Sequence, residues 1–302
     1  MLGRCERPLL SRLRAPIPHW ESEIYSTGKI IRSSTGWSSL LPVGFMSDHG
    51  VSADGRVSRN EVQNQVPHLV WHAGKAQLLR EKYSMSVIES CHPWVFWRKE
   101  NEFLATPNKV VTFIPHSTPE IGSHITDQHK YITEIIDLYG ARNVVLCFQY
   151  HDVVNRRFEE WLKYGLTMTT AGNSLVPTFV DRFHAILQHA ELVTTSGIGS
   201  HVYFALAAGI RTEIRGHMEE IPKKGGAYEG GSHPKYKFGV DAAFPGQDDQ
   251  LELLLRSGLN VDSPLVQSLV AQALNQDAAW PVLEIRAALR ANLGEVFKPK
   301  RR

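Results

Sequence analysis

Short apolar runs alternate with amphipathic stretches through the second half of the chain. The run from Lys109 is rich in β-branched residues and ends before Pro115, which is typical of a buried strand. Residues 126–140 repeat apolar side chains at helical spacing, with Thr126 as the expected N-cap and Gly140 as the stop. The alternation continues with expected strands at residues 143–149, 166–172, 190–195 and 210–214 and expected helices at residues 155–165, 178–190 and 199–208. This order predicts an α/β fold whose βαβ units build a parallel sheet.

The first hundred residues carry a weaker pattern. The elements expected there are a strand and polar loop over residues 40–50, a strand and helix over residues 67–84, and an apolar, aromatic segment over residues 86–97. The polar stretch 98–108 reads as a linker, so we expect a smaller α/β domain at residues 1–106 and a second domain at residues 107–302. Near the C-terminus, the pattern predicts a long lid-like loop over residues 219–239 and helices over residues 263–276 and 279–294.

Polar residues cluster where the expected strands end. In open parallel sheets, ligands bind outside the carboxyl ends of the strands. The candidates there are His116, Ser117, Thr118, His151, Asp152, Gly172, Asn173, Thr195, Ser196, Gly197, Gly199, Ser200 and His201. Glycine and asparagine also occur in purely structural turns, which remains an alternative for some of these positions. Several separate histidines and hydroxyls along one sheet edge nevertheless predict a ligand site.

The loop from Ser196 to His201 joins an expected strand to an expected helix. A helix that begins near Gly199 points free backbone N–H groups and the positive end of its dipole toward the loop. The glycines would let a phosphate group approach, and the hydroxyls of Ser196 and Ser200 would add donors. The motif is only a fragment of the dinucleotide fingerprint, and the chain has no P-loop lysine, so Walker-type ATP hydrolysis is not expected. A tight turn that lets the helix pack on the sheet is the alternative.

Composition narrows the class of protein without naming a ligand. The 302 residues are 42% hydrophobic and 21% charged, with a net charge of +2, so a nucleic-acid partner is not expected. The cysteines are Cys5, Cys91 and Cys147, with no CxxC pair, which argues against a zinc site or a disulfide framework and favours a reducing compartment. We expect a cytoplasmic protein. A basic start containing Arg4, Arg7, Arg12 and Arg14 leaves peripheral contact with the inner face of a membrane as an alternative.

A resemblance to a known family rests on four segments of the second half. These are "VTFIPHSTPE", "VVLCFQYHD", "GLTMTTAGN" and "ELVTTSGIGSHVYFALAAGI". Together they resemble the nucleotide-sugar half of GT-B fold glycosyltransferases, in particular bacterial enzymes of capsule and lipopolysaccharide biosynthesis of the sialyl- and Kdo-transferase types. The resemblance covers residues 109–214 and fits the N-terminal part only loosely. It implies two Rossmann-like domains facing across a cleft, with a CMP- or UDP-linked sugar on the C-terminal domain and a glycan or lipid-linked acceptor on the other.

The reaction implied by the resemblance is displacement at an anomeric carbon, which needs a base for the acceptor hydroxyl and neutralisation of the leaving phosphate. Asp48 and His49 are the candidates for the base, although a surface turn explains them equally well. We assign His116 to the phosphate or to protonation of the leaving group, with a turn-capping histidine as the alternative. His151 and Asp152 are assigned to donor or ribose binding. The other histidines, including His72 and His92 near aromatic residues, are expected in the core or on the surface.

No Asp-x-Asp motif occurs in the sequence, and Asp248 and Asp249 are adjacent in an expected loop. The mechanism is therefore expected to use neither a metal nor a further cofactor. Two other functions stay open. A GT-B type sugar-nucleotide epimerase would need carboxylates such as Asp152 and Glu213 deep in the cleft, and a non-catalytic nucleotide-binding protein would need no base.

Overall fold

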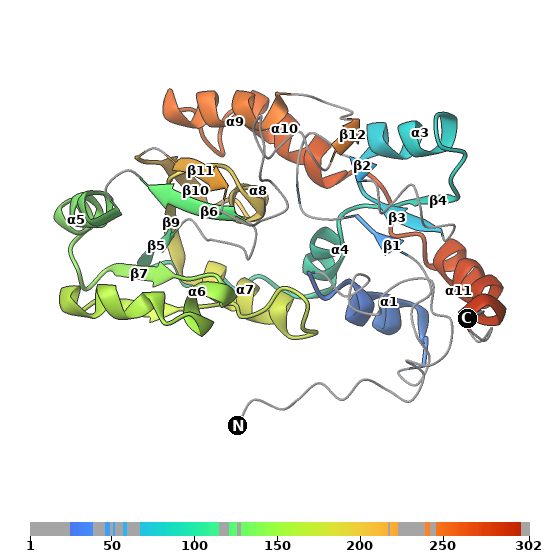
Figure 1. Ribbon diagram of the computed structural model, residues 1–302, viewed down its shortest axis with the longest axis horizontal. Coiled ribbons are helices and arrows are strands. Elements are labelled where there is room, and N and C mark those ends of the chain that lie inside the picture. The colour runs from blue at the N-terminus through green and yellow to red at the C-terminus, as the bar shows by residue number, and fades with distance from the viewer. Residues whose placement is uncertain are drawn as a thin grey trace.

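The computed structural model describes residues 25–38, 46–48, 51, 57–58, 67–114, 121–125, 128–216, 218–222, 239–241 and 246–296. Within them, the chain forms an α/β fold with two parallel sheets and two short antiparallel ribbons. Figure 1 shows the larger sheet toward the left and the smaller sheet toward the right, with helices around both. The expected α/β class with parallel sheets is confirmed, and this arrangement is compatible with a Rossmann-like fold.

The larger sheet has five parallel strands in the order β10-β9-β5-β7-β8. The strands are β5 (Lys109–Phe113), β7 (Val144–Cys147), β8 (Thr167–Thr169), β9 (Ala190–Thr195) and β10 (Arg211–Ile214). These elements match the five apolar runs in the sequence. Because the strands are parallel, the polar segments that follow them all lie along one edge of the sheet.

Helices cover both faces of this sheet, as the alternation of side chains along β5 shows. Val110 packs in the cluster that contains α5 (Gln128–Tyr139) and the 3-10 helix η3 (Arg157–Tyr164). Val111 and Phe113 point to the opposite face, in the cluster that contains α7 (Phe179–Gln188) and α8 (Ser200–Ala207). Burial on both faces explains why the strand sequences are continuously apolar instead of alternating.

The smaller sheet is formed by the N-terminal part of the chain. Its parallel strands, in the order β1-β3-β4, are β1 (Met46–Ser47), β3 (His68–Val70) and β4 (Val87–Glu89). The helices beside it are α1 (Thr27–Thr35), α3 (Ala73–Glu81) and α4 (Pro93–Glu100). The strand and helix expected within residues 67–84 are confirmed, and the apolar segment that follows them divides into β4 and α4.

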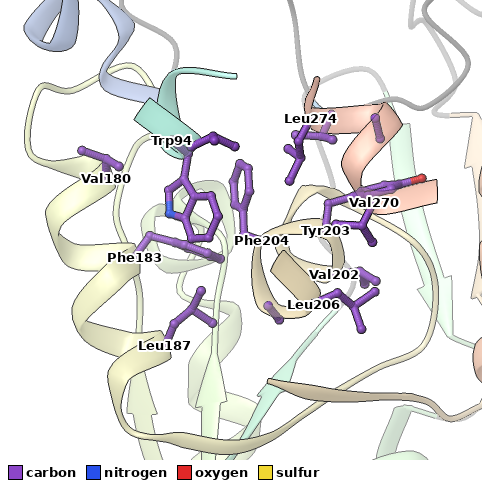
Figure 2. Packing of buried hydrophobic residues seen from close by; sticks show 14 of the residues in the cluster. Trp94, Val180, Phe183, Leu187, Val202, Tyr203, Phe204, Leu206, Val270 and Leu274 are labelled. Atoms are coloured by element: carbon purple, nitrogen blue, oxygen red, sulfur yellow. The ribbon is translucent and has the colours of Figure 1, made fainter. Parts of the chain in front are cut away.

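One hydrophobic cluster joins the two sheets. It contains Leu69 and Ile88 from the smaller sheet, Val111 and Val193 from the larger sheet, and Phe204 from α8. Figure 2 shows the centre of this cluster, where Trp94 of α4 lies beside Phe204 with Phe183 of α7 below them. The rings of Trp94 and Phe204 stack with their centroids 5.0 Å apart. The two sheets therefore share one buried cluster, and each sheet also packs a separate cluster, one that contains Val110 and one that contains Val70.

The remaining elements connect parts of the chain that are distant in sequence. Two antiparallel ribbons pair β6 (Ile121–Ile125) with β11 (Met218–Pro222) and β2 (Val57–Ser58) with β12 (Gly239–Asp241). The C-terminal helices are α9 (Gln247–Arg256), α10 (Pro264–Leu274) and α11 (Val282–Val296). Helix α11 returns to α1, where Arg286 Nε donates to the carbonyl oxygen of Thr35 at 2.6 Å. The two expected C-terminal helices are thus confirmed.

Three local expectations need correction. Asp248 and Asp249 lie in the first turn of α9 and not in a loop, and Tyr203 donates a hydrogen bond to Asp248. The stretch expected as a long loop begins with β11, which finds its partner in β6 almost a hundred residues earlier in the chain. The expected helix over residues 155–165 is a 3-10 helix, preceded by the short helix α6 (Tyr150–Val154).

In the part of the chain that the structure describes, no helix is both long and apolar enough to span a bilayer.

Candidate functional site

At the carboxyl end of the larger sheet, the start of α8 contacts the N-terminal part of the chain. This helix follows β9 through the loop Ser196–Gly199. Its first residue, Ser200, accepts a hydrogen bond from the backbone N–H of Val51 at 3.3 Å. Val51 lies three residues beyond Asp48, which directly follows β1 of the smaller sheet. The helix start predicted to bind phosphate is therefore the point where the larger sheet meets the N-terminal part of the chain.

The hydroxyl of Thr195 determines which ring nitrogen of His201 carries the proton. The hydroxyl of Thr195 donates to the carbonyl oxygen of Gly197 at 3.2 Å, which uses its only hydrogen. The His201 ring nitrogen Nε2 lies 2.9 Å from the same hydroxyl oxygen. Nε2 must therefore carry the proton and donate to Thr195. The other ring nitrogen, Nδ1, lies on the side of the ring that faces Gly199.

The His201 ring is also held from two sides by its neighbours. It stacks on Phe113, the last residue of β5, with the centroids 4.5 Å apart. A Cβ atom added to Gly199 would lie 3.0 Å from Nδ1 and Cε1 of the ring. Gly199 has extended backbone with φ −161°, so glycine is needed here for space and not for its conformation. The loop thus keeps the Nδ1 side of His201 directly against the backbone of Gly199.

Two further hydroxyls lie in or beside this loop. Ser196 is 1% exposed, and among the described residues its Oγ has no hydrogen-bond partner. The Ser200 Oγ lies 2.9 Å from the phenolic oxygen of Tyr25, in addition to its bond from Val51. A helix start turns backbone N–H groups toward the preceding loop, and in α8 the N–H of Val202 donates to the carbonyl oxygen of Gly199 at 2.9 Å. The start of α8 therefore combines backbone donors, hydroxyls and a histidine, which are the groups that bind a phosphate.

At the smaller sheet, Asp48 forms a buried ion pair with Lys75 of α3. Asp48 is 6% exposed and Lys75 is 2% exposed. A buried lysine is rare and is normally paired, because an isolated buried charge costs a large desolvation energy. Such pairs add little stability compared with apolar residues of the same size. The structure thus places a buried carboxylate, paired with a lysine, directly after a parallel strand of the smaller sheet.

Four predicted site residues lie outside the described residues: His49, His116, Ser117 and Thr118. Three of them belong to the segment that follows β5, and His49 directly follows Asp48. Their proposed roles stay predictions.

The candidates after β7 lie on the short helix α6. Asp152 is buried, and its Oδ1 accepts a hydrogen bond from Arg157 at 3.1 Å. His151 is half-buried, and its backbone N–H donates at 2.6 Å to the side-chain oxygen of Gln149, which caps the helix. Asp152 thus lies inside the fold beside an arginine, while His151 lies near the surface.

The candidates after β8 form a turn. Gly172 has φ +83°, a left-handed conformation that favours glycine. The side-chain oxygen of Asn173 accepts a hydrogen bond from the N–H of Leu175 at 2.9 Å, which is a local turn contact. Gly172 and Asn173 therefore have the geometry of a structural turn, which was the alternative to a ligand-binding role at these two positions.

The sequence pattern missed two residues of the site, Tyr25 and Lys75. Tyr25 precedes the first described helix, and a single tyrosine in that stretch has no periodic signal that sets it apart. Lys75 lies in the first turn of α3 and has the appearance of an ordinary surface lysine. Only the tertiary contacts to Ser200 and Asp48, respectively, reveal either residue.

The histidines expected in the core are confirmed there. His72 and His92 are buried, and the His92 ring contacts Trp71, Tyr25 and Phe204. Burial lowers the pKa of His92 to about 3, so this histidine is neutral at physiological pH. His92 Nδ1 accepts a hydrogen bond from the N–H of Trp94 at 3.0 Å, which caps α4.

Carboxylates elsewhere along the sheet edge are engaged by arginines. Glu213 of β10 forms an ion pair with Arg215 at 2.6 Å and accepts a hydrogen bond from Tyr139 at 2.9 Å. Burial acts to raise the pKa of Glu213, but the bonds from Arg215 and Tyr139 outweigh it and leave that pKa lowered. Within the described ranges, no group of three or more His, Cys, Asp or Glu side chains is arranged to hold a metal ion.

Comparisons with known proteins place this chain in no family. A scan against protein-family models and a search of curated proteins each found no match.

Proposed function

We propose that the protein is a glycosyltransferase that moves a sugar from a CMP- or UDP-linked donor to a glycan or lipid-linked acceptor. In this proposal the phosphate groups of the donor bind at the start of α8, and the acceptor binds toward the smaller sheet. The arrangement of two Rossmann-like domains across a cleft, as in GT-B glycosyltransferases, is part of the proposal.

The observation that carries the proposal is the contact of the N-terminal part of the chain with Ser200, at the start of α8. A transfer reaction needs a site for the donor and a site for the acceptor within bonding distance of each other. The hydrogen bonds of Ser200 to Val51 and Tyr25 bring the N-terminal part of the chain to the helix start at which a nucleotide phosphate would bind. A protein that only binds a nucleotide would not require this second parallel sheet beside the phosphate site.

The residues at the helix start supply what the leaving group needs. The negative charge that develops on a leaving phosphate would be stabilised by the first-turn N–H groups of α8 and by the hydroxyls of Ser196 and Ser200. His201 lies at the same place with its Nδ1 side toward Gly199. Because Nε2 donates to Thr195, Nδ1 could donate a proton or a hydrogen bond to the leaving group only when the ring is doubly protonated. On the acceptor side, Asp48 and His49 remain the proposed base, with Lys75 compensating the charge of the buried carboxylate.

The epimerase alternative has no comparable support. Its two carboxylates would be Asp152 and Glu213, and both are paired with arginines at positions after β7 and on β10, respectively. These strands are separated by β5 and β9 in the sheet. A non-catalytic nucleotide-binding protein is an outcome of the experiment below.

The proposal is tested first by nucleotide binding. We expect CMP or UDP to raise the midpoint of thermal unfolding more than GDP or ADP, because a ligand that binds only the native state stabilises it by mass action. Sugar transfer from CMP- and UDP-sugars to glycan acceptors is then measured on the same protein. No shift with any of the four nucleotides would contradict the proposal, and binding without transfer would favour a non-catalytic role.

A substitution at Gly199 localises the site. Gly199→Val places side-chain atoms against His201 and in front of the helix start, so we expect nucleotide binding to be lost while the fold is retained. His201→Ala is the matched control, because it removes the ring with which the new side chain collides. If His201→Ala alone still binds nucleotide and the double variant Gly199→Val/His201→Ala does not, the valine blocks the ligand itself. Nucleotide affinity of Gly199→Val equal to that of the wild type would remove the loop from the site.

A further inference from the structure

The hydroxyls of Tyr25 and Ser200 form a pair in which one hydrogen is left over. The two oxygens lie 2.9 Å apart, and Ser200 Oγ also accepts the N–H of Val51 at 3.3 Å. Two hydroxyls have two hydrogens, and the contact between them uses one. The second hydrogen must point to a third group.

The chemistry of the pair indicates which hydrogen remains. A phenol is more acidic than an aliphatic alcohol and is therefore the better donor. Burial raises the pKa of Tyr25 above its ordinary value, so the phenol stays protonated at neutral pH. With Tyr25 donating to Ser200 and Val51 donating to the same oxygen, both acceptor positions of Ser200 Oγ are occupied. The Ser200 hydrogen is then available to a ligand at the start of α8.

The backbone holds Tyr25 in this position at an energetic cost. Tyr25 has φ +51° and Ser26 has φ +59°, left-handed conformations that are unfavourable for residues other than glycine. Several contacts hold them there. The N–H of Tyr25 donates to the carbonyl oxygen of Ser174 at 2.9 Å, and Ser26 Oγ accepts the N–H of Val180 at 3.1 Å. Strained backbone that is held by many contacts is typical of functional positions.

A second observation indicates that a ligand belongs here. Ser196, in the loop that leads to α8, is buried to 1% exposure, and its Oγ lacks a hydrogen-bond partner among the described residues. A buried hydroxyl without a partner costs free energy unless a ligand or water satisfies it. Ser196 and Ser200 flank the glycine-containing turn in the sequence, so the hydroxyl without a partner belongs to the loop that leads directly into the helix start.

We propose that Tyr25 is a positioning residue that orients the Ser200 hydroxyl toward a phosphate oxygen bound at the start of α8. Tyr25 acts through Ser200 and does not touch the phosphate. The inference rests on the proposed function for the identity of the ligand, a nucleoside mono- or diphosphate. It adds a residue from the N-terminal part of the chain to the donor site.

The test is a double-mutant cycle on anion affinity. Inorganic pyrophosphate, CMP and UDP are each titrated calorimetrically into the wild type, Tyr25→Phe, Ser200→Ala and the double variant. Tyr25→Phe keeps the ring contacts to His92, Phe179 and Phe204 and removes only the hydroxyl. Tyr203→Phe is the matched control, since its hydroxyl, on the same helix, donates to Asp248 and not to Ser200.

We expect Ser200→Ala to weaken binding about tenfold or more, because a hydrogen bond to a charged group is lost. Tyr25→Phe should weaken binding about threefold to tenfold in the wild-type background and have no effect in the Ser200→Ala background, because residues that act through one another are not additive. Tyr203→Phe should leave the affinity unchanged.

Two results would overturn the inference while leaving the proposed function intact. These are an unchanged affinity in Tyr25→Phe, or the same loss from Tyr25→Phe with and without Ser200, which would indicate a structural role or direct contact. Suppose that the pyrophosphate affinities of the four proteins change as predicted and that neither CMP nor UDP binds more tightly than pyrophosphate. That result would support the positioning role of Tyr25 and contradict the nucleotide-sugar site. A wild type that binds none of the probes would overturn both.

Discussion

His92 illustrates how burial of a single residue couples protonation to folding. Its ring is fully buried among aromatic side chains, and its Nδ1 caps α4. The pKa of His92 is lowered to about 3 in the folded state, whereas an unfolded histidine has a pKa near 6.5. Between these two values the unfolded chain binds a proton that the folded chain does not. This residue therefore makes the folded state less stable as the pH falls from about 6.5 toward 3.

We predict that His92→Asn flattens the pH dependence of stability in that window. Asparagine retains a side-chain acceptor for the helix cap but has no titrating group. In the wild type, His92 contributes a loss of at most about 1.4 kcal/mol per pH unit below pH 6.5. The measurement is the free energy of urea unfolding between pH 5 and 8. The control is His189→Asn, since His189 is exposed. If the free energy of unfolding of His92→Asn changes with pH as steeply as that of the wild type, His92 is not the source of the pH dependence.

At the scale of elements, hydrophobic periodicity predicted most of what is regular in the fold. The strands of the larger sheet and helices α5, α7 and α8 follow from local sequence, because each has a complete apolar run or face. Helix α9 was missed because its apolar residues follow Gln247, Asp248 and Asp249, which resemble a polar loop. The β6–β11 ribbon could not be predicted, because its pairing depends on where two distant segments meet in space.

The same limit applies to the candidate site. The sequence indicated the strand ends and the helix start at Ser200, since both follow from the order of elements. It gave no sign of Tyr25 or Lys75, whose partners Ser200 and Asp48 lie 175 and 27 residues away in the chain. Contacts of this kind come from packing of the two sheets and have no local pattern.

Two glycines on either side of β8 allow the cost of backbone strain to be separated from the cost of steric crowding. Gly172 and Gly165 both have positive φ, +83° and +63°. A Cβ added at Gly172 would lie 2.9 Å from Nη1 of Arg182, whereas one at Gly165 would meet nothing within 4 Å. We predict that Gly165→Ala lowers the free energy of unfolding by about 1 kcal/mol through backbone strain alone.

Gly172→Ala should cost the same strain and, in addition, displace Arg182. Because a guanidinium at the end of a flexible side chain can move, the extra cost is expected to be small, below about 1 kcal/mol. Chemical denaturation of both variants measures the difference. Truncating the arginine in Gly172→Ala/Arg182→Ala should remove that difference. A loss several-fold larger in Gly172→Ala would mean that the turn cannot shift Arg182 at all.

At the scale of the whole molecule, the last described helix packs against the first one. Helix α11 packs against α1, where Trp280 Nε1 donates to Ser34 Oγ at 2.9 Å. Ile285 and Leu289 of α11 belong to the same hydrophobic cluster as Phe204 and Val193 of the larger sheet. The last described helix thus stabilises the first one, and both border the core that joins the two sheets. Unfolding of one end should therefore destabilise the other.

Two residues of α11 test this coupling. Ile285 is 0% exposed, and Leu283 on the same helix is 78% exposed. We predict that Ile285→Ala lowers the free energy of unfolding by about 2 to 5 kcal/mol because it leaves a cavity in the shared core. Leu283→Ala removes a similar number of atoms at the surface and should change stability by less than about 0.5 kcal/mol.

The shape of the unfolding transition then distinguishes two sheets that unfold together from two sheets that unfold separately. Tryptophan fluorescence reports on the seven tryptophans of the chain, among them the buried Trp71 and Trp94 near the joint between the sheets and Trp161 on the outer face of the larger sheet. Far-ultraviolet circular dichroism reports on all helices and strands. If the two sheets unfold together, both signals will shift by the same amount in Ile285→Ala and will coincide, as two-state unfolding requires. If the signals separate, with only part of the helical signal lost early, the C-terminal helices and the smaller sheet would form a unit that unfolds independently. The contact at Ser200 between the donor site and the N-terminal part would then be an interface between units that can move, and its hydrogen bonds would open and close with them.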